Sequence, residues 1–143
     1  MSGRETAAGP ERNGQLRPGV RGHAACAVCA ENTARAMGSG ELPVFATPAL
    51  AACMERAAAA SVAPLLPRGH TSVGVRLCLE HTAATPVGME VRCESELTAV
   101  DGRRLTFSIT AYDGAGEIGR AEHVRAIVDA QRFLEKTEGK RNP

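Results

Sequence analysis

The chain has 143 residues, of which 43% are hydrophobic and 3% aromatic, and its formal net charge is +1. This length predicts a single domain, and the balanced charge excludes the strong field with which a basic protein attracts nucleic acid or a membrane surface. The core must consist mainly of aliphatic side chains and alanine, because the chain has three Phe, one Tyr and no Trp.

The N-terminal segment is polar and rich in Gly, Arg and Pro, so we expect a disordered tail at residues 1–18 and one domain at residues 19–138. The tail lacks the apolar core of a signal peptide, and no run of about 18 apolar residues predicts a membrane span. Five cysteines in a chain without a signal peptide indicate reduced thiols. We therefore expect a cytoplasmic protein with no membrane partner.

The first predicted strand, residues 19–30, contains a CxxC pair formed by Cys26 and Cys29. Such a pair can be half of a zinc site or a redox couple. A structural zinc site needs a second ligand pair at matching spacing, and the other three cysteines are isolated in the sequence. We interpret Cys26 and Cys29 as small residues that pack in a strand, and we expect no metal.

The rest of the chain is organised around one alanine-rich helix at residues 49–63, which follows a short helical turn at residues 31–37. Thr47 is a good N-cap, because its hydroxyl can accept a hydrogen bond from a first-turn amide, and Pro48 suits the first helical position. Pro64 ends the helix. Its apolar residues at helical spacing are Leu50, Met54, Ala57 and Ser61.

From His70 the hydrophobic pattern changes to a period of two, which indicates strands. On the strand at residues 70–81, the face that should meet the helix carries Val73, Val75, Leu77, Leu79 and His81. Further strands are predicted at residues 89–100, 103–112 and 117–128, followed by a short helix at residues 131–138. One helix and a run of strands predict an α+β fold with the helix on an antiparallel sheet. Such a thin sheet leaves apolar surface, so we expect a partner subunit.

Four polar residues on these elements are candidates for chemistry, and each has an alternative structural interpretation. Thr47 and Glu55 share one side of the helix, because eight residues are about two turns. Thr47 can be only a cap, Glu55 can point to solvent near Arg56, and His81 can be a satisfied histidine at a strand end. His123 lies on the opposite face from Val124, so we expect it at the surface. A Glu and a His brought together beside an apolar tunnel would suit acyl transfer.

Several segments resemble the fluoroacetyl-CoA thioesterase family of hotdog-fold proteins, over roughly residues 15–137. The most specific of them is the HTAATPVG run at residues 81–88. The separations from Thr47 to Glu55 and from Glu55 to His81 fit the catalytic residues of the family without gaps. The remaining segments are Val44–Thr47, Met54–Glu55, Gly74, Asp101–Leu105, Glu117–Gly119, His123 and Arg125–Ala126.

This resemblance implies a hotdog fold, with one long helix wrapped by a curved antiparallel sheet, in a homodimer that has its acyl-thioester site at the subunit interface. It implies hydrolysis of an acyl-CoA by a catalytic set of Thr47, Glu55 and His81. Glu55 would be the base or the attacking carboxylate, Thr47 would support it, and His81 would position the acyl group and handle protons. It also assigns Gly74, Phe45 and Arg125 to substrate binding, with coenzyme A entering only as part of the substrate and no cofactor.

Residues 37–42 depart from the family pattern, in which a longer segment carries phenylalanines that cover the acyl group. Here the segment is short and has no aromatic residue. We therefore expect an acyl specificity that differs from that for fluoroacetyl, while the chemistry is kept. The alternative function is a non-catalytic hotdog dimer that binds acyl-CoA or another small ligand. The CoA phosphates would use arginines at the pocket mouth, and the candidates are Arg68, Arg103, Arg104 and Arg125.

Overall fold

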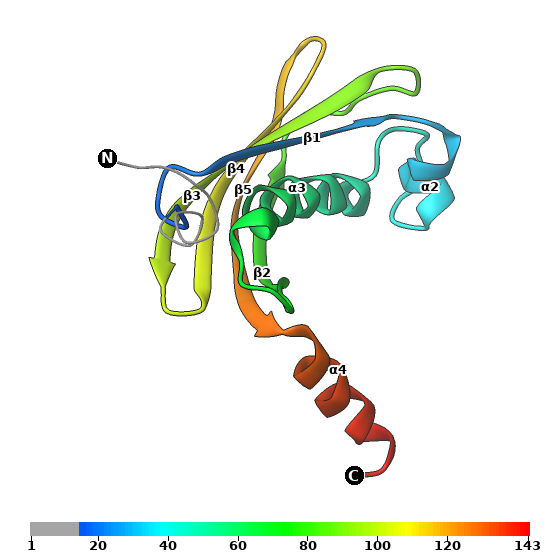
Figure 1. The fold of residues 1–143 in the computed structure, drawn as a ribbon. Coiled ribbons are helices and arrows are strands. Elements are labelled where there is room, and N and C mark those ends of the chain that lie inside the picture. The colour runs from blue at the N-terminus through cyan, green and yellow to red at the C-terminus, as the bar shows by residue number, and fades with distance from the viewer. Residues whose placement is uncertain (1–14) are drawn as a thin grey trace.

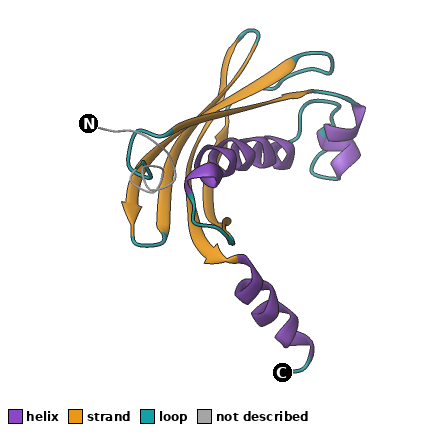
Figure 2. Ribbon diagram, in the orientation of Figure 1, coloured by secondary structure: helices purple, strands orange, loops and turns teal. Residues whose placement is uncertain are grey.

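A computed structural model describes residues 15–143, and Figure 1 shows one helix held inside a curved sheet. The sheet is antiparallel with strand order β1-β3-β4-β5-β2. The helix, α3 (Thr47–Val62), lies against its concave face (Figure 2). The strands are β1 (Arg21–Ala27), β2 (His70–His81), β3 (Glu90–Asp101), β4 (Arg104–Asp113) and β5 (Gly116–Asp129). The expected α+β arrangement is confirmed.

The core lies between α3 and the inner face of the sheet, and it is aliphatic as the composition requires. Alternate residues of β3 and β4 are buried, among them Val91, Leu97 and Phe107, which confirms the period of two predicted for these strands. From α3 the core receives Leu50, Cys53, Met54, Ala57, Ala58 and Val62.

Small residues allow α3 to approach β1 closely. A Cβ atom added at Gly22 of β1 would lie 2.5 Å from Ser61 Cβ and 2.6 Å from the Ala57 carbonyl oxygen of α3. No real Cβ contact is that short, so any side chain at Gly22 would push the helix away from the sheet. The alanine-rich helix and this glycine together explain how a chain with few aromatic residues forms a close-packed core.

A β-bulge in β2 changes which residues of this strand face α3. The pairing with β5 passes from Gly74 opposite Arg125 directly to Arg76 opposite Val124, so Val75 is an extra residue and is 48% exposed. The single apolar row predicted from Val73 to His81 is therefore wrong, because the bulge shifts its phase by one residue. Gly74, rather than Val75, faces the helix together with Leu77 and Leu79.

A second bulge, at Ile118 in β5, has the same effect. Ala111 of β4 pairs with Gly119, whereas Tyr112 pairs with Glu117, so Ile118 is the extra residue. The phase after the bulge places Ala121, His123 and Arg125 on the inner face. The prediction of a surface histidine at residue 123 is wrong, because His123 is 0% exposed.

Short helices extend the fold beyond the two ends of α3. Helix α2 (Ala34–Met37) follows β1, whereas α4 (Ala130–Glu138) continues from β5 and runs away from the sheet (Figure 1). Single 3-10 turns lie at η1 (Ala30–Asn32), η2 (Ala63–Leu65) and η3 (Gly139–Arg141). Within residues 15–143, no helix has the length and apolarity needed to cross a membrane.

The expected N-terminal boundary of the domain, at residue 19, lies close to the start of the described residues. Most of the predicted tail, residues 1–14, lies outside the described residues, and the next residues form turns in which Leu16 packs against the core.

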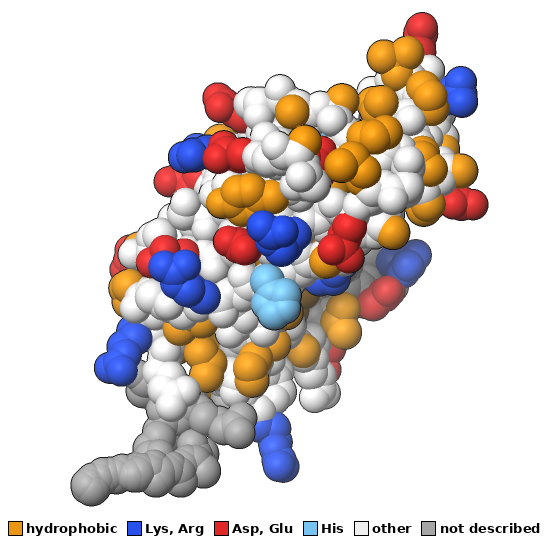
Figure 3. Space-filling view, turned by 90° about the horizontal axis from the view of Figure 1, so that it is seen from above, with side chains coloured by type: hydrophobic (Ala, Val, Ile, Leu, Met, Phe, Trp, Pro, Cys, Tyr) orange, Lys and Arg blue, Asp and Glu red, His pale blue; other side chains and the backbone are white. Residues whose placement is uncertain are grey.

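On the face shown in Figure 3, positively and negatively charged side chains are interspersed with hydrophobic ones. Exposed ion pairs such as Arg92–Glu94 match this mixture, which fits a net charge near zero.

Candidate active site

Thr47 is the first residue of α3, and its hydroxyl lies 2.8 Å from Nδ1 of His81. The residue at the N-cap is Ala46, whose side chain makes no capping bond, and Pro48 occupies the first turn. The interpretation of Thr47 as the N-cap is therefore wrong. Its hydroxyl bonds to a histidine 34 residues away instead of to the helix backbone.

The segment from His81 to Gly88 crosses the start of α3 and brings the histidine to Thr47. The Phe45 amide donates to the Thr85 carbonyl at 2.9 Å, and Val44 forms a bridge with Pro86. Thr85 is fully buried, and its hydroxyl donates to Asp113 Oδ2 at 2.7 Å, which fixes this segment to the end of β4. This buried, hydrogen-bonded turn thus holds Thr47 and His81 together.

His81 has the electrostatic character of a neutral base. Burial lowers its pKa, and the nearby backbone of Ala83 opposes this effect only in part. The ring is therefore neutral at pH 7. Its Nε2 atom is buried and has no partner among the described residues. A buried polar atom without a partner is expensive, so Nε2 is suited to meet a group that enters the site.

A pocket of about 260 Å³ opens beside this pair. Thr47 and His81 lie in its wall together with Phe45, which is itself 1% exposed, and with Ser39 from the loop after α2. The segment in which the sequence departs from the family pattern, residues 37–42, thus borders the pocket. The remaining lining residues are Ala34, Val44, Thr82, Ala83 and Ala84.

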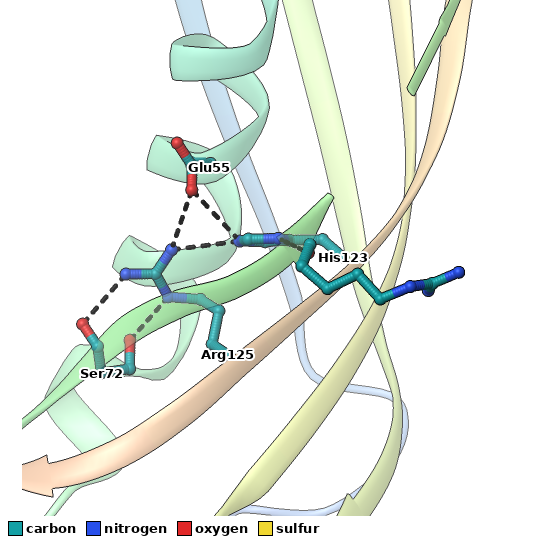
Figure 4. A network of polar contacts seen from close by, with 5 residues as sticks. Glu55, Ser72, His123 and Arg125 are labelled. Atoms are coloured by element: carbon teal, nitrogen blue, oxygen red, sulfur yellow. Dashed lines mark hydrogen bonds and ion pairs between the residues drawn. The ribbon is translucent and has the colours of Figure 1, made fainter. Parts of the chain in front are cut away.

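Glu55 lies farther along α3, about 12 Å from Thr47 at the usual helical rise. Its Oε2 atom is 3.9 Å from Nε2 of His123 and 3.9 Å from Nη1 of Arg125, as Figure 4 shows. A Cβ atom at Gly74 would lie 2.5 Å from the same carboxylate oxygen, so a glycine is required for this approach. Within residues 15–143 of one protomer, no direct contact joins Glu55 to His81.

Arg125 connects Glu55 to the sheet. Its side chain is 9% exposed, and its Nε and Nη2 atoms donate to the hydroxyl and the carbonyl oxygen of Ser72 at 2.7 and 2.9 Å. Burial lowers the pKa of Arg125, and the negative charge of Glu55 opposes this effect. The guanidinium therefore faces Glu55. The Glu55 side chain is 43% exposed, and Arg56 donates to the Ala25 carbonyl instead of pairing with Glu55.

Sequence reasoning placed the candidate His123 at the surface and did not consider Ser72 as a member of this site. His123 and Arg125 are two residues apart on one strand, a spacing that places both side chains on the same face. This spacing could have indicated that His123 and Arg125 belong to one polar cluster, because a buried arginine requires polar neighbours. Ser72 carried no such signal, since its contact with Arg125 depends on the pairing register of β2 with β5.

The CxxC pair has the properties of packed thiols. Cys26 of β1 packs against the core, and burial raises its pKa to about 11, which keeps the thiol protonated at neutral pH. Cys29 lies after the strand, at the start of η1. Residues 15–143 contain no group of three or more His, Cys, Asp or Glu side chains arranged to hold a metal ion.

Comparison with known proteins identifies the family to which this chain is similar. The sequence profile of fluoroacetyl-CoA-specific thioesterases matches residues 28–131. A fluoroacetyl-CoA thioesterase from Streptantibioticus cattleyicolor is 42% identical over 97 residues, which are 68% of this chain and 70% of that protein. A crystal structure of a mutant fluoroacetyl-CoA-specific thioesterase with fluoroacetate and CoA has a TM-score of 0.78 and 36% identity, and the match covers 82% of this chain and 99% of that chain.

The fold also resembles that of a protein outside the fluoroacetyl-CoA thioesterases compared above. A hotdog-like protein from Thermanaerovibrio acidaminovorans has a TM-score of 0.79 and 26% identity, with 88% of this chain and 93% of that chain covered. The hotdog fold expected from the sequence is therefore confirmed.

Proposed function

This chain belongs to the fluoroacetyl-CoA-specific thioesterase family, and on that basis we propose that it hydrolyses a short acyl-CoA to the acid and free CoA, with Thr47, Glu55 and His81 as its catalytic set. The chain is a thioester hydrolase of hotdog fold. The observation that carries the residue assignment is the 2.8 Å contact between the Thr47 hydroxyl and His81 Nδ1 at a pocket. Coenzyme A enters as part of the substrate, and the proposal needs no cofactor.

In the proposed reaction, the carbonyl carbon of the thioester gains an oxygen from water and loses the sulfur of CoA. His81 is neutral, so its free Nε2 can receive the proton that the attacking water loses, from Glu55 when Glu55 is the base or directly from the water that hydrolyses the anhydride, and pass it to the departing thiolate. Thr47 holds the ring through Nδ1. Glu55 is the base for the attacking water, or attacks the carbonyl itself and forms an anhydride that water then hydrolyses.

We further propose that the working unit is a homodimer. The strand β2 is an edge of the sheet, because it pairs only with β5 among the described strands. An unpaired edge of twelve residues invites pairing with another chain, and a second copy of β2 would continue the sheet. Light scattering at micromolar concentration should give twice the chain mass of 14.9 kDa. A mass of one chain would refute the dimer.

The acyl group is proposed to differ from that of fluoroacetyl-specific relatives, because the segment beside the pocket has no aromatic cover. Leu42 is 65% exposed and Met37 is 45% exposed, and neither lines the pocket. A less covered pocket should admit larger acyl groups and more water.

Release of free thiol from a panel of acyl-CoAs tests the proposed function. The panel contains fluoroacetyl, acetyl, malonyl, medium-chain and aromatic acyl groups. We expect turnover of at least one member, with a preference other than fluoroacetyl. Preference for fluoroacetyl would place selectivity in residues other than the 37–42 segment. Tight CoA binding without turnover of any member would refute hydrolysis and favour the non-catalytic binding dimer.

A further inference from the structure

His123 is a fully buried histidine at the centre of a polar network, and the catalytic set does not include it. Its ring lies 6.1 Å from that of Phe107, centroid to centroid, on the inner face of the sheet. A buried imidazole in such apolar surroundings needs a hydrogen-bond partner for each of its two nitrogens. The structure supplies both partners, and their chemistry fixes the position of the proton.

Nδ1 of His123 must carry the proton of the ring. It lies 2.8 Å from the carbonyl oxygen of Arg76, which can only accept a hydrogen bond. Burial lowers the pKa of His123, and the positive charge of Arg125 lowers it further, although the bond to Arg76 and the charge of Glu55 act in the opposite direction. The ring is thus neutral, and Nε2 has a free lone pair.

That lone pair is used by Arg125. Nη1 of Arg125 lies 3.1 Å from Nε2 of His123, and a guanidinium can only donate. The two bonds to Ser72 hold the other side of the guanidinium. Three fixed acceptors therefore orient Arg125 so that Nη1, which donates to His123, also lies 3.9 Å from Glu55 Oε2, on the side shown in Figure 4.

We propose that His123 is a positioning residue, a fixed neutral acceptor that aims the Arg125 guanidinium at Glu55 and so holds the Glu55 carboxylate in place over Gly74 for catalysis. This inference rests on the proposed role of Glu55. His123 is not a base in the reaction, because its lone pair is occupied by Arg125. It is not a cationic partner of Glu55 either, since a proton on Nε2 would face the guanidinium of Arg125.

Three variants of His123 separate its two hydrogen bonds. His123→Gln can present an amide oxygen to Arg125, His123→Asn is shorter and reaches only towards the Arg76 carbonyl, and His123→Phe keeps the ring without either bond. We expect Gln to retain kcat within about threefold of wild type, and Asn and Phe to lower kcat by about tenfold or more with little change in KM. Thermal unfolding of each variant shows which of them are folded.

A double-variant cycle tests whether His123 acts through Arg125. Adding His123→Phe to Arg125→Ala should lower kcat no further than Arg125→Ala alone. Without the guanidinium of residue 125, Nε2 of His123 has no donor to orient. Additive losses would overturn the proposal, and so would folded Phe and Asn variants with wild-type kcat. In both cases the wild-type enzyme still hydrolyses acyl-CoA, so the proposed function would stand.

A spectroscopic measurement does not depend on the reaction. In nitrogen-15 NMR spectra of the wild-type protein at pH 7, the His123 ring should be neutral with its proton on Nδ1. The His123→Gln spectrum assigns the signal. A ring protonated on Nε2, or on both nitrogens, would overturn the proposal even if acyl-CoA turnover were normal.

Discussion

The hydroxyl of residue 47 is the group that ties the first turn of α3 to the candidate base His81. Thr47→Ser keeps this hydroxyl, so its kcat/KM should stay within about threefold of wild type. Thr47→Ala leaves Nδ1 without its partner, and a lost hydrogen bond of about 1.5 kcal/mol corresponds to roughly a tenfold lower kcat/KM. Initial rates of thiol release measure both variants. Equal activity of the Ala and Ser variants would exclude a role for the hydroxyl.

Gly74 is expected to matter for activity and not for stability. The Cβ atom of Gly74→Ala would meet the tip of the Glu55 side chain, at 2.5 Å, and a flexible tip can move aside with little loss of folding energy. The displaced carboxylate would lose its place beside Arg125, so we expect kcat to fall by about tenfold or more while the unfolding temperature is kept.

Gly139→Ala is the matched control for Gly74→Ala, because a Cβ atom there meets nothing within 4 Å. A Gly74→Ala enzyme as active as this control would contradict the requirement for a glycine beside Glu55.

Among the elements, α4 adds a basic groove of about 670 Å³ at the ends of β2 and β5. Arg103, Arg132, Lys136 and Lys140 line it together with apolar residues such as Phe133. Of the arginines expected to bind the CoA phosphates, Arg103 lies here, whereas Arg125 is buried against Glu55. The groove lies at the end of β2 nearer to Gly74 and Glu55, and we expect it to receive the nucleotide of a CoA that approaches from the Glu55 side, since phosphates favour such charged donors.

Reversal of charge tests this groove. The double variant Arg132→Glu and Lys136→Glu should raise KM for an acyl-CoA by about tenfold and leave kcat unchanged, because only binding energy is removed. An acyl-pantetheine lacks the nucleotide, so its kcat/KM should not change. Arg21→Glu, at an exposed position of β1, is the control. Equal effects on both substrates would argue against nucleotide binding in the groove.

The elements themselves were predictable, because period-two burial in β3 and β4 and the alanine-rich α3 follow directly from residue type. The phase of β2 and β5 was not. A single bulged residue, Val75 or Ile118, exchanges the two faces of a strand, and nothing in the apolar pattern marks it. For this reason the pairing of Glu55 with Arg125 and His123 required the structure, whereas Thr47, Glu55 and His81 were found from spacing and resemblance.

For the whole molecule, the half-buried His81 and the buried His123 make stability depend on pH. Burial lowers the pKa of both His81 and His123 in the folded state, so the unfolded chain binds more protons once the pH falls below its histidine value of about 6.5. The full free energy of unfolding is therefore present above that pH, and it decreases as the pH falls towards the lowered pKa values of His81 and His123 in the folded state. The slope is at most about 1.4 kcal/mol per pH unit for each histidine.

Urea unfolding at pH 7.5, 6.5 and 5.5 measures this loss, which should begin between the last two values. The His123→Gln variant should show a smaller slope, because one of the two groups is gone. A free energy of unfolding that stays constant down to pH 5.5 would contradict the burial of neutral histidines.

The central claim, an acyl-CoA thioesterase that uses Glu55, is tested most directly by kcat of Glu55→Gln on the best substrate of the panel. The substitution keeps the shape of the side chain and removes its basicity. With Glu31→Gln, at an exposed position, as the control, we predict a fall in kcat of about 100-fold or more for Glu55→Gln alone. A folded Glu55→Gln enzyme with wild-type kcat would contradict the account.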